Sequence, residues 1–189
     1  MVTFIKRNIF YKVGFLLIII SCLLVISNQV LVIEKIITEE KIIDNIINTD
    51  NKKVNNYKSN YVAVLEIPKI SLKKGLVDIN SKYNDVDKNI QIISSDIANI
   101  EKESIILAAH SGSGYKAFFK DLHKLKINDL ASVYYNSKKY NYFVTDIYTE
   151  LKDSDIEIPV SNNLLILTTC YGKDEQLVVI LEKDYEGFS

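Results

Sequence analysis

Few side chains in this sequence carry a thiol, an imidazole or a guanidinium. Its 189 residues include two cysteines, two histidines and a single arginine, Arg7. The formal net charge is −1 and no nucleic-acid-binding motif is present, so we expect no nucleic-acid partner. The sequence contains no internal repeats. Its apolar fraction of 48% and its charged fraction of 25% are typical of a globular protein, so a hydrophobic core can form.

Residues 1–33 are predicted to form a cytoplasmic tip and a transmembrane anchor. The run from Val13 to Ile26 carries no charge, and apolar character resumes after a short polar break and continues to Ile33. Together these residues are long enough for a membrane-spanning helix, which needs about twenty. Membrane lipid is therefore the expected partner of this segment.

The positive charges before the apolar run predict the topology. They come from Lys6, Arg7 and Lys12, and few basic residues follow the run, so the N-terminus is expected in the cytoplasm and the rest of the chain outside the cell. A cleaved signal peptide is the alternative, but no small-x-small cleavage site follows the apolar core. Cys22 would lie in the bilayer and could not pair with Cys170, so we expect no structural disulfide.

Residues 34–60 are predicted to form an extracellular stalk or linker. Isoleucines recur in its first half with helical spacing, at Ile36, Ile37, Ile42, Ile43, Ile46 and Ile47. The second half is rich in Asn and Lys, which predicts a flexible tether that holds the following domain off the membrane. An amphipathic helix lying on the bilayer or packed on the domain is the alternative.

Residues 61–189 are predicted to form a mainly β globular domain. Strand-like runs are separated by turns, and they cover Tyr61–Ile67 (ended by Pro68), Leu76–Ile79, Ser104–His110, Ala131–Tyr135, Tyr140–Glu150, Leu164–Thr169 and Leu177–Leu181. Several short strands at this spacing favour a closed antiparallel β-barrel. The stretch from Tyr83 to Ile93 is expected to be helical or irregular.

One helix is predicted within this domain, over residues 116–126. Its sequence KAFFKDLHKLK would place Phe118, Leu122 and Leu125 on one face. His123 would fall on the opposite face. We therefore interpret His123 as a solvated surface residue rather than a catalyst.

Cys170 and His110 each end a predicted strand. Cys170 follows the apolar run Leu164–Thr169 and precedes a polar loop that contains Gly172, so its thiol is expected to be half exposed, which suits a nucleophile. A buried free cysteine is the alternative. His110 ends the apolar run SIILAAH. A sheet could bring two such strand ends together, and a Cys–His enzyme needs that pairing.

These motifs resemble those of the sortases, the cysteine transpeptidases of Gram-positive cell surfaces. The sortase nucleophile lies in a Leu-x-Leu-x-Thr-Cys strand, matched here by Leu165, Leu167, Thr169 and Cys170. The catalytic His of the family ends an earlier strand, as His110 does, and is followed by Phe-x-x-Leu-x-x-Leu-x-x-Gly-Asp. That pattern is matched by Phe119, Leu122, Leu125 and Asp129, with Asn128 in the Gly place. The resemblance covers roughly residues 61–181 and implies the family's eight-stranded β-barrel with short helices.

The resemblance also implies a reaction and its participants. Cys170 would be the nucleophile and His110 the general acid and base. Their substrate would be a sorting signal similar to Leu-Pro-x-Thr-Gly near the C-terminus of a secreted protein. A thioester would form on Cys170, and an amine from a cell-wall precursor would resolve it. Thr169 and Ala109, beside these two residues, are implied to border the bound substrate.

The sequence departs from the family at one important position. Sortases carry an Arg on the strand after the Cys, where it contacts the substrate and the developing oxyanion. Aligning the strands places Gln176 there, and Arg7 is expected on the cytoplasmic side of the membrane, so it could not substitute. A Gln amide can donate a hydrogen bond but brings no charge, and Lys173 in the preceding loop is the alternative donor. The chain is then either a working variant or an inactive relative that only binds sorting signals. A smaller departure is Ala109, which replaces a Gly that often precedes the family's His and leaves less room beside the ring.

No cofactor is required by this chemistry, although acidic side chains flank the site. In some sortases, two loops together bind a Ca²⁺. The corresponding loops of this sequence carry carboxylates that could serve as ligands, at Glu101, Glu103, Asp153, Asp155 and Glu157. A solvated acidic loop is the ordinary explanation. No Asp-Pro lid motif precedes the barrel and no second apolar span follows it. An anchoring sortase is therefore expected rather than a pilin polymerase.

Overall fold

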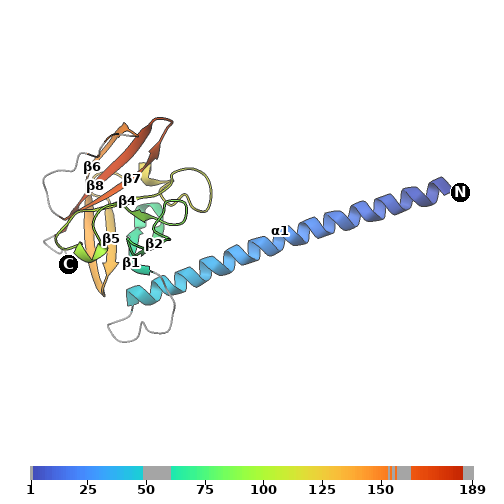
Figure 1. Ribbon diagram of the computed structural model, residues 1–189, viewed down its shortest axis with the longest axis horizontal. Helices are drawn as coiled ribbons and strands as arrows, with labels where there is room; N and C mark the ends of the chain where they lie inside the picture. The colour runs from blue at the N-terminus through green and yellow to red at the C-terminus, as the bar shows by residue number, and fades with distance from the viewer. Residues whose placement is uncertain (1, 49–60, 153, 155, 157–162, 185–189) are drawn as a thin grey trace. The chain divides into compact units, whose positions relative to one another are not determined.

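The computed structural model describes residues 2–48, 61–152, 154, 156 and 163–184 (Figure 1). The chain divides into two compact units, Met1–Ile42 and Ile43–Ser189. The first unit is helical, and the second holds all the strands found among the described residues.

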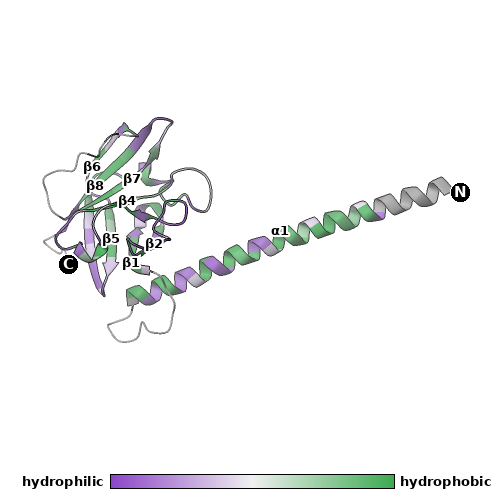
Figure 2. Cartoon of the chain, in the orientation of Figure 1, coloured by the Kyte–Doolittle hydropathy of each residue, from purple (hydrophilic) through white to green (hydrophobic). Residues whose placement is uncertain are grey.

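Helix α1 spans Val2–Asn48 without a break. The stretch contains no proline and a single glycine, so nothing in it interrupts the helical hydrogen bonds. Between Lys12 and Ile47 it is long and apolar enough to cross a membrane, and its apolar side chains from Val13 to Ile37 are exposed. Figure 2 shows apolar residues along much of this helix and polar bands towards its C-terminal end. A signal sequence near the N-terminus can also be a long apolar helix, so the membrane anchor stays a prediction.

The predicted stalk begins as a continuation of this helix. The isoleucines between Glu34 and Asn48 had helical spacing, and these residues are helical. No break marks the expected boundary at residue 33, and residues 49–60 lie outside the described part of the chain. The division into tip, stalk and catalytic domain therefore stays a prediction.

Eight strands form one sheet in the described part of the second unit (Figure 1). They are β1 (Tyr61–Ile67), β2 (Leu72–Val77), β3 (Gln91–Ile92), β4 (Ile105–Ala108), β5 (Leu130–Tyr135), β6 (Lys138–Leu151), β7 (Leu164–Tyr171) and β8 (Glu175–Lys183). Their order in the sheet is β2-β1-β5-β6-β8-β7-β4-β3. The end strands β2 and β3 contact each other, so the sheet curves into a nearly closed barrel. The predicted fold class is confirmed.

The expectation of a wholly antiparallel barrel is wrong at one pair of strands. Strand β4 pairs with β7 in parallel, in the register Ala108↔Thr168, whereas every other neighbouring pair is antiparallel. Parallel neighbours end at the same edge of a sheet, so the C-terminal ends of β4 and β7 lie together. This single parallel pair decides where the candidate site lies.

The strand β7 is buried on both of its faces. Side chains alternate along a strand, so Leu165 and Leu167 enter the main core inside the barrel, whereas Ile166 faces outward. The outward residues form a second buried cluster made of Ile106, Leu164, Ile166, Val178 and Ile180, with Tyr148 and Ile156 packed against it. We call this side of the sheet the outer face. Burial on both sides explains why the sequence LLIL is continuously apolar.

The predicted helix at residues 116–126 is wrong. Only Leu122–Lys124 form a helical turn, the 3₁₀ segment η3, and turns make up most of the rest. The buried side chains of this segment are Ala117, Phe119, Leu122 and Leu125, a spacing that no single α-helical face provides. Tertiary burial therefore outweighs the local helical pattern. His123 is exposed, as predicted.

Most predicted strands are confirmed, with shifted ends. Strand β2 begins at Leu72 and not at Leu76, because its polar first half pairs with β1. The β5–β6 hairpin turns at Asn136 and Ser137, both with positive φ (49° and 60°), which is the geometry of a two-residue hairpin turn. Turns, and not a helix, lead into β3. Pro68 opens the short 3₁₀ turn η1 (Pro68–Ile70), and η2 spans Ile97–Asn99.

Candidate active site

His110 and Cys170 are held beside each other by the β4–β7 pairing. Beyond the last ladder pair, the backbone N–H of Ala109 donates to the carbonyl of Thr168 at 3.3 Å. The Thr169 hydroxyl donates to the carbonyl of Ala109 at 2.6 Å, and the Ser111 hydroxyl donates to the carbonyl of Cys170. These three bonds continue the strand alignment past the strand ends. The residue on each side of His110 is therefore tied to the segment that ends in Cys170.

Cys170 lies in the penultimate position of β7 and its thiol is exposed and free. Side-chain alternation places it on the outer face, like Ile166. Ala109 belongs to the inner core, so the same alternation puts His110 on the outer face as well. The imidazole is 44% exposed. The two side chains that the sequence singled out thus share one solvent-accessible side of the sheet.

Gln176 also lies on the outer face, directly opposite Cys170 in the β7–β8 ladder. Its amide nitrogen donates to the Glu150 carboxylate at 3.0 Å and to the Ser154 carbonyl at 3.2 Å. Glu150 is itself the ladder partner of Gln176 on β6. Glu150, Gln176 and Cys170 therefore form one row across strands β6, β8 and β7. The side-chain amide of Gln176 donates its hydrogen bonds to Glu150 and Ser154, on the β6 side of this row. The predicted oxyanion role of Gln176 stays a prediction.

The remaining predicted site residues lie close to this row. Lys173 is exposed in the turn between β7 and β8, where Gly172 adopts a positive φ of 61°. Thr169 and Ala109 are buried, with relative exposures of 6% and 4%, and they bond to each other. We expect them to fix the positions of Cys170 and His110, because their side chains do not lie on the outer face.

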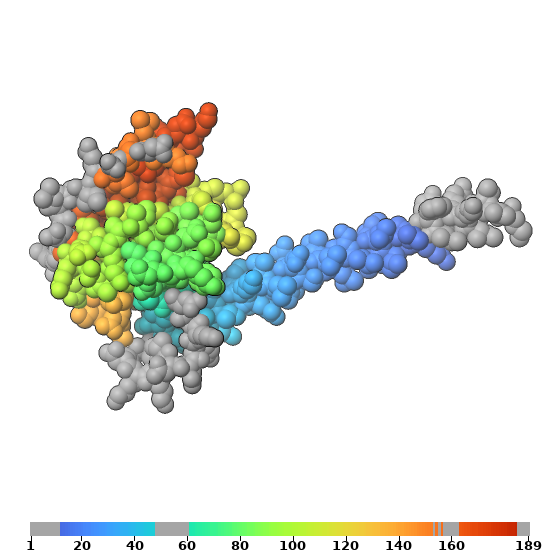
Figure 3. Space-filling view, viewed as in Figure 1, coloured from blue at the N-terminus to red at the C-terminus, as the bar shows by residue number. Residues whose placement is uncertain are grey.

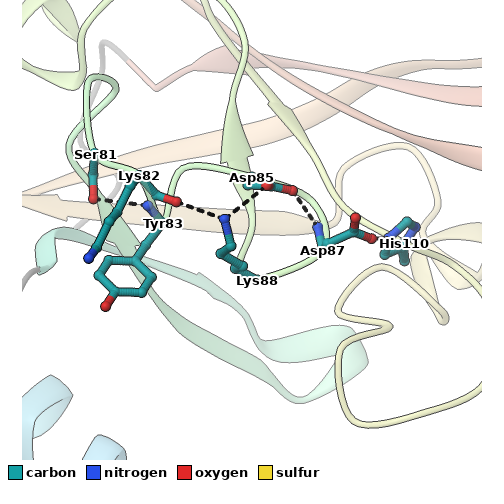
Figure 4. Close-up of polar contacts among 7 residues, drawn as sticks. All are labelled: Ser81, Lys82, Tyr83, Asp85, Asp87, Lys88 and His110. Atoms are coloured by element: carbon teal, nitrogen blue, oxygen red, sulfur yellow. Dashed lines mark hydrogen bonds and ion pairs between the residues drawn. The ribbon is translucent and has the colours of Figure 1, made fainter.

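Asp87 is a residue that the sequence reasoning missed. Its carboxylate oxygen lies 2.9 Å from Nε2 of His110 (Figure 4). It comes from the long connection between β2 and β3, which is rich in turns. An acidic residue in such a loop has no distinctive sequence signal, since its partner is contributed by a different strand. His110 also borders an open pocket of about 330 Å³, whose other lining residues are Gly112, Ser113, Gly114, Tyr115, Lys116 and Ala117.

The acidic residues weighed as calcium ligands are occupied or lie outside the described part. The Glu101 carboxylate accepts from the Tyr140 hydroxyl at 2.8 Å and from Lys138 at 3.0 Å, and these bonds lower its pKa, with Tyr140 contributing most. Glu103 accepts from Ser95 and Asn99. Asp153, Asp155 and Glu157 lie outside the described residues. Within the described ranges, no three His, Cys, Asp or Glu side chains gather as metal ligands.

An eight-stranded barrel with a cysteine and a histidine at neighbouring strand ends defines the architecture expected of a cysteine transpeptidase. The sortase domain model matches residues 65–183, so the chain belongs to the sortase family. A comparison with curated proteins found no match.

Solved sortases share the fold at low sequence identity. Sortase C1 from Streptococcus agalactiae is 24% identical, with a TM-score of 0.58 and coverage of 71% of this chain and 72% of that one. Clostridium perfringens sortase C, solved with the C-terminal cell wall sorting motif, is 22% identical, with a TM-score of 0.56 and coverage of 79% and 86%. Sortase A from Corynebacterium diphtheriae is 13% identical, with a TM-score of 0.58 and coverage of 80% and 86%. Because sortases C and A both match, the expected anchoring subclass stays a prediction.

Proposed function

We propose that this protein is a membrane-tethered cysteine transpeptidase that cleaves a sorting signal near the C-terminus of secreted proteins. It would join the released end to an amine of a cell-wall precursor. The observation that carries this proposal is the placement of Cys170 and His110 at the ends of the parallel strands β4 and β7, on one exposed face. The related Clostridium perfringens sortase C, solved with a sorting motif, supports a substrate of this kind.

The reaction divides into two acyl transfers. The Cys170 thiolate attacks the carbonyl carbon of the scissile peptide, a C–S bond forms, and the C–N bond breaks. The His110 imidazolium gives its proton to the departing amine, which otherwise would leave as an unstable anion. An incoming amine then attacks the thioester, His110 takes up its proton, and the thiolate leaves. These two steps balance without a metal ion or a redox partner.

The oxyanion of each tetrahedral intermediate needs a hydrogen-bond donor. Gln176 lies opposite Cys170 on the same face, which makes it the first candidate. Its amide hydrogens are held by Glu150 and Ser154, so one of them must be released as the substrate binds. Lys173 in the adjoining turn is the second candidate, and it would bring charge.

A catalytically silent module that only binds sorting signals is the second candidate function. The observation that favours it is the engagement of both Gln176 donors by Glu150 and Ser154, in a chain whose only arginine is Arg7. Such a module would retain the exposed face that carries Cys170 and His110 but lack the stabilisation of the oxyanion, and one donor of that kind contributes about 10²–10³ in rate.

The experiment uses the full chain in liposomes with a peptide that contains a Leu-Pro-x-Thr-Gly-like signal. Intact-mass measurement after quenching detects an acyl adduct on Cys170, and an added amine converts it to a transpeptidation product. We expect the adduct for the wild type and none for Cys170→Ala. Peptide binding without any adduct, together with slow alkylation of Cys170 at neutral pH, would leave the silent binding module as the correct function.

The proposed location follows from the N-terminal helix. An uncleaved helix with a cytoplasmic N-terminus would place the barrel on the outer side of the membrane, where secreted substrates and cell-wall precursors are present. Its length and exposed apolar surface support this placement. The absence of a lid motif in the sequence supports an anchoring subclass.

A further inference from the structure

We propose that Asp87 is a positioning residue for His110, fixing the tautomer and orientation of its imidazole. This inference rests on the proposed function, since it assigns the base of that reaction a partner. Oδ1 of Asp87 lies 2.9 Å from Nε2 of His110. A carboxylate only accepts hydrogen bonds, so Nε2 carries the hydrogen and Nδ1 is the basic nitrogen of the neutral ring.

The tautomer matters for the proton transfers. With Nε2–H directed at Asp87, Nδ1 is the nitrogen that takes a proton from the Cys170 thiol or the incoming amine and returns it to the departing amine. The carboxylate also stabilises the imidazolium formed in each step, by the charge-assisted hydrogen bond on its far side. Asp87 itself neither gains nor loses a proton in this sequence.

The loop that carries Asp87 is ordered by its own hydrogen bonds (Figure 4). The Asp85 carboxylate accepts from the backbone N–H of Asp87 at 2.9 Å and from Lys88 at 3.1 Å. Lys88 also donates to the carbonyl of Lys82 at 2.9 Å. The two hydrogen bonds to the Asp85 carboxylate lower its pKa, and the bond from the Asp87 backbone is the larger cause. The backbone position of Asp87 is thereby fixed within the loop.

Two asparagines attach this loop to the barrel. The Asn84 amide donates to the carbonyls of Ile79 and Ile92, at 3.0 and 2.9 Å, and its oxygen accepts from the N–H of Ile92 at 2.7 Å. The buried Asn89 donates to the carbonyl of Gly75 on β2 at 2.9 Å. In the space-filling view, the segment between β2 and β4 covers the front of the barrel (Figure 3). The loop is therefore a fixed part of the domain, and its carboxylate is presented to His110 by a rigid support.

The size of the effect follows from exposure. The Asp87 side chain is 79% exposed and that of His110 is 44% exposed, so water competes for both. Exposed ion pairs contribute little, and removing this one is expected to lower the acylation rate about two- to fivefold. Asp87→Asn tests the assigned tautomer more sharply than Asp87→Ala does. An amide can donate to Nε2 and so favour the wrong tautomer, which leaves Nδ1 carrying the hydrogen.

The test compares Asp87→Asn with wild type in the full chain, in detergent, by two independent readouts. Nitrogen-15 NMR of the histidine rings reports the tautomer, and the chain has only one other histidine, the exposed His123, which serves as an internal reference. The acylation rate with the sorting-signal peptide reports the consequence. Asp78→Asn is the matched control, because it removes a carboxylate of the same segment that accepts from the backbone N–H of Asn80 at 2.8 Å.

We expect Asp87→Asn to shift the ring-nitrogen resonances of His110 but not those of His123, and to lower the acylation kcat two- to fivefold with KM unchanged. Asp87→Glu should restore part of the rate, and Asp78→Asn should match wild type in both readouts. Unchanged His110 resonances in Asp87→Asn overturn the proposal, as does an unchanged acylation rate. If the wild type forms no adduct, the proposed function fails by itself, and the NMR shift together with the rate of Cys170 alkylation still decides the role of Asp87.

Discussion

The amide of Gln176 donates to the carboxylate of Glu150 at 3.0 Å, while the backbone of Gln176 pairs with Cys170 on the opposite neighbouring strand. The Gln176 amide nitrogen is therefore directed at an acidic neighbour on β6. An arginine at position 176 is expected to meet the same carboxylate. We expect Glu150 to compete with an oxyanion beside Cys170 for any hydrogen-bond donor at this position.

The first prediction concerns that carboxylate. Glu150→Gln removes the charge that holds the Gln176 amide, so the amide turns more readily to the substrate carbonyl and the acylation rate should rise several-fold. The rate of adduct formation measured by intact mass checks this. The double variant Glu150→Gln with Gln176→Ala is the control, and it should lose the gain. An equal gain in the double variant would show that the effect does not pass through Gln176.

The second prediction concerns the oxyanion donor. Gln176→Ala should lower the acylation rate by about 10²–10³, with alkylation of Cys170 unchanged, because the donor acts on the transition state and not on the thiol. Gln176→Arg should raise the rate, and more so together with Glu150→Gln, since the new guanidinium would otherwise pair with Glu150. Lys173→Ala should be mild. A severe loss in Lys173→Ala with a mild loss in Gln176→Ala would assign the oxyanion to the lysine.

The third prediction concerns the nucleophile and the base. Cys170→Ala should abolish the adduct, and His110→Ala should lower turnover by about 10²–10⁴, the range typical of general acid–base catalysis. His123→Ala should leave turnover unchanged, since that side chain is exposed and its Nδ1 lies 3.1 Å from the Lys120 carbonyl. The rate of transpeptidation of the sorting-signal peptide, measured for each purified variant, checks all three. Equal losses in the two histidine variants would contradict the assignment of His110.

The sequence alone could predict the strand ends that form the site, but not their neighbours. Cys170 and His110 each follow an apolar run, and such a run indicates a buried strand. The pattern is the same for a strand in parallel or antiparallel pairing, so the parallel β4–β7 pair could not be deduced. The register that sets Glu150 beside Gln176 is equally invisible, because it depends on long-range pairing.

The errors arose where local pattern and tertiary burial disagree. Residues 116–126 have helical spacing, yet Phe119 is fully buried while Phe118 is only partly so. The backbone of this segment adopts turns because they bury its apolar side chains in the core, which outweighs the local helical spacing. Asp87 was missed for the opposite reason. It lies in a turn-rich loop without periodicity, and its partner is 23 residues away in the sequence.

The fourth prediction concerns the N-terminal helix. Because no cleavage site follows the apolar run and positive charges precede it, the chain in the membrane fraction should retain its N-terminus. N-terminal sequencing of that fraction checks this. A mature start at or beyond Asn28 would show that the segment is a signal peptide, and the barrel would then need another attachment.

The fifth prediction concerns acid and the loop that supports Asp87. The pKa of Asp85 is lowered below its usual 3.8, chiefly by the backbone N–H of Asp87 and then by Lys88. A carboxyl whose pKa is lower in the folded state contributes stability above its unfolded value and loses it as the pH falls through the folded value. Asp85→Asn keeps an acceptor for the Asp87 N–H but does not titrate. Its Tm should therefore lie below that of wild type at pH 6, and the two should converge as the pH falls below 3.8.

Thermal unfolding of both proteins between pH 6 and pH 3 measures this, with Asp78→Asn as the reference. A Tm difference between Asp85→Asn and wild type that stays constant over this range would mean that the Asp85 charge does not stabilise the loop.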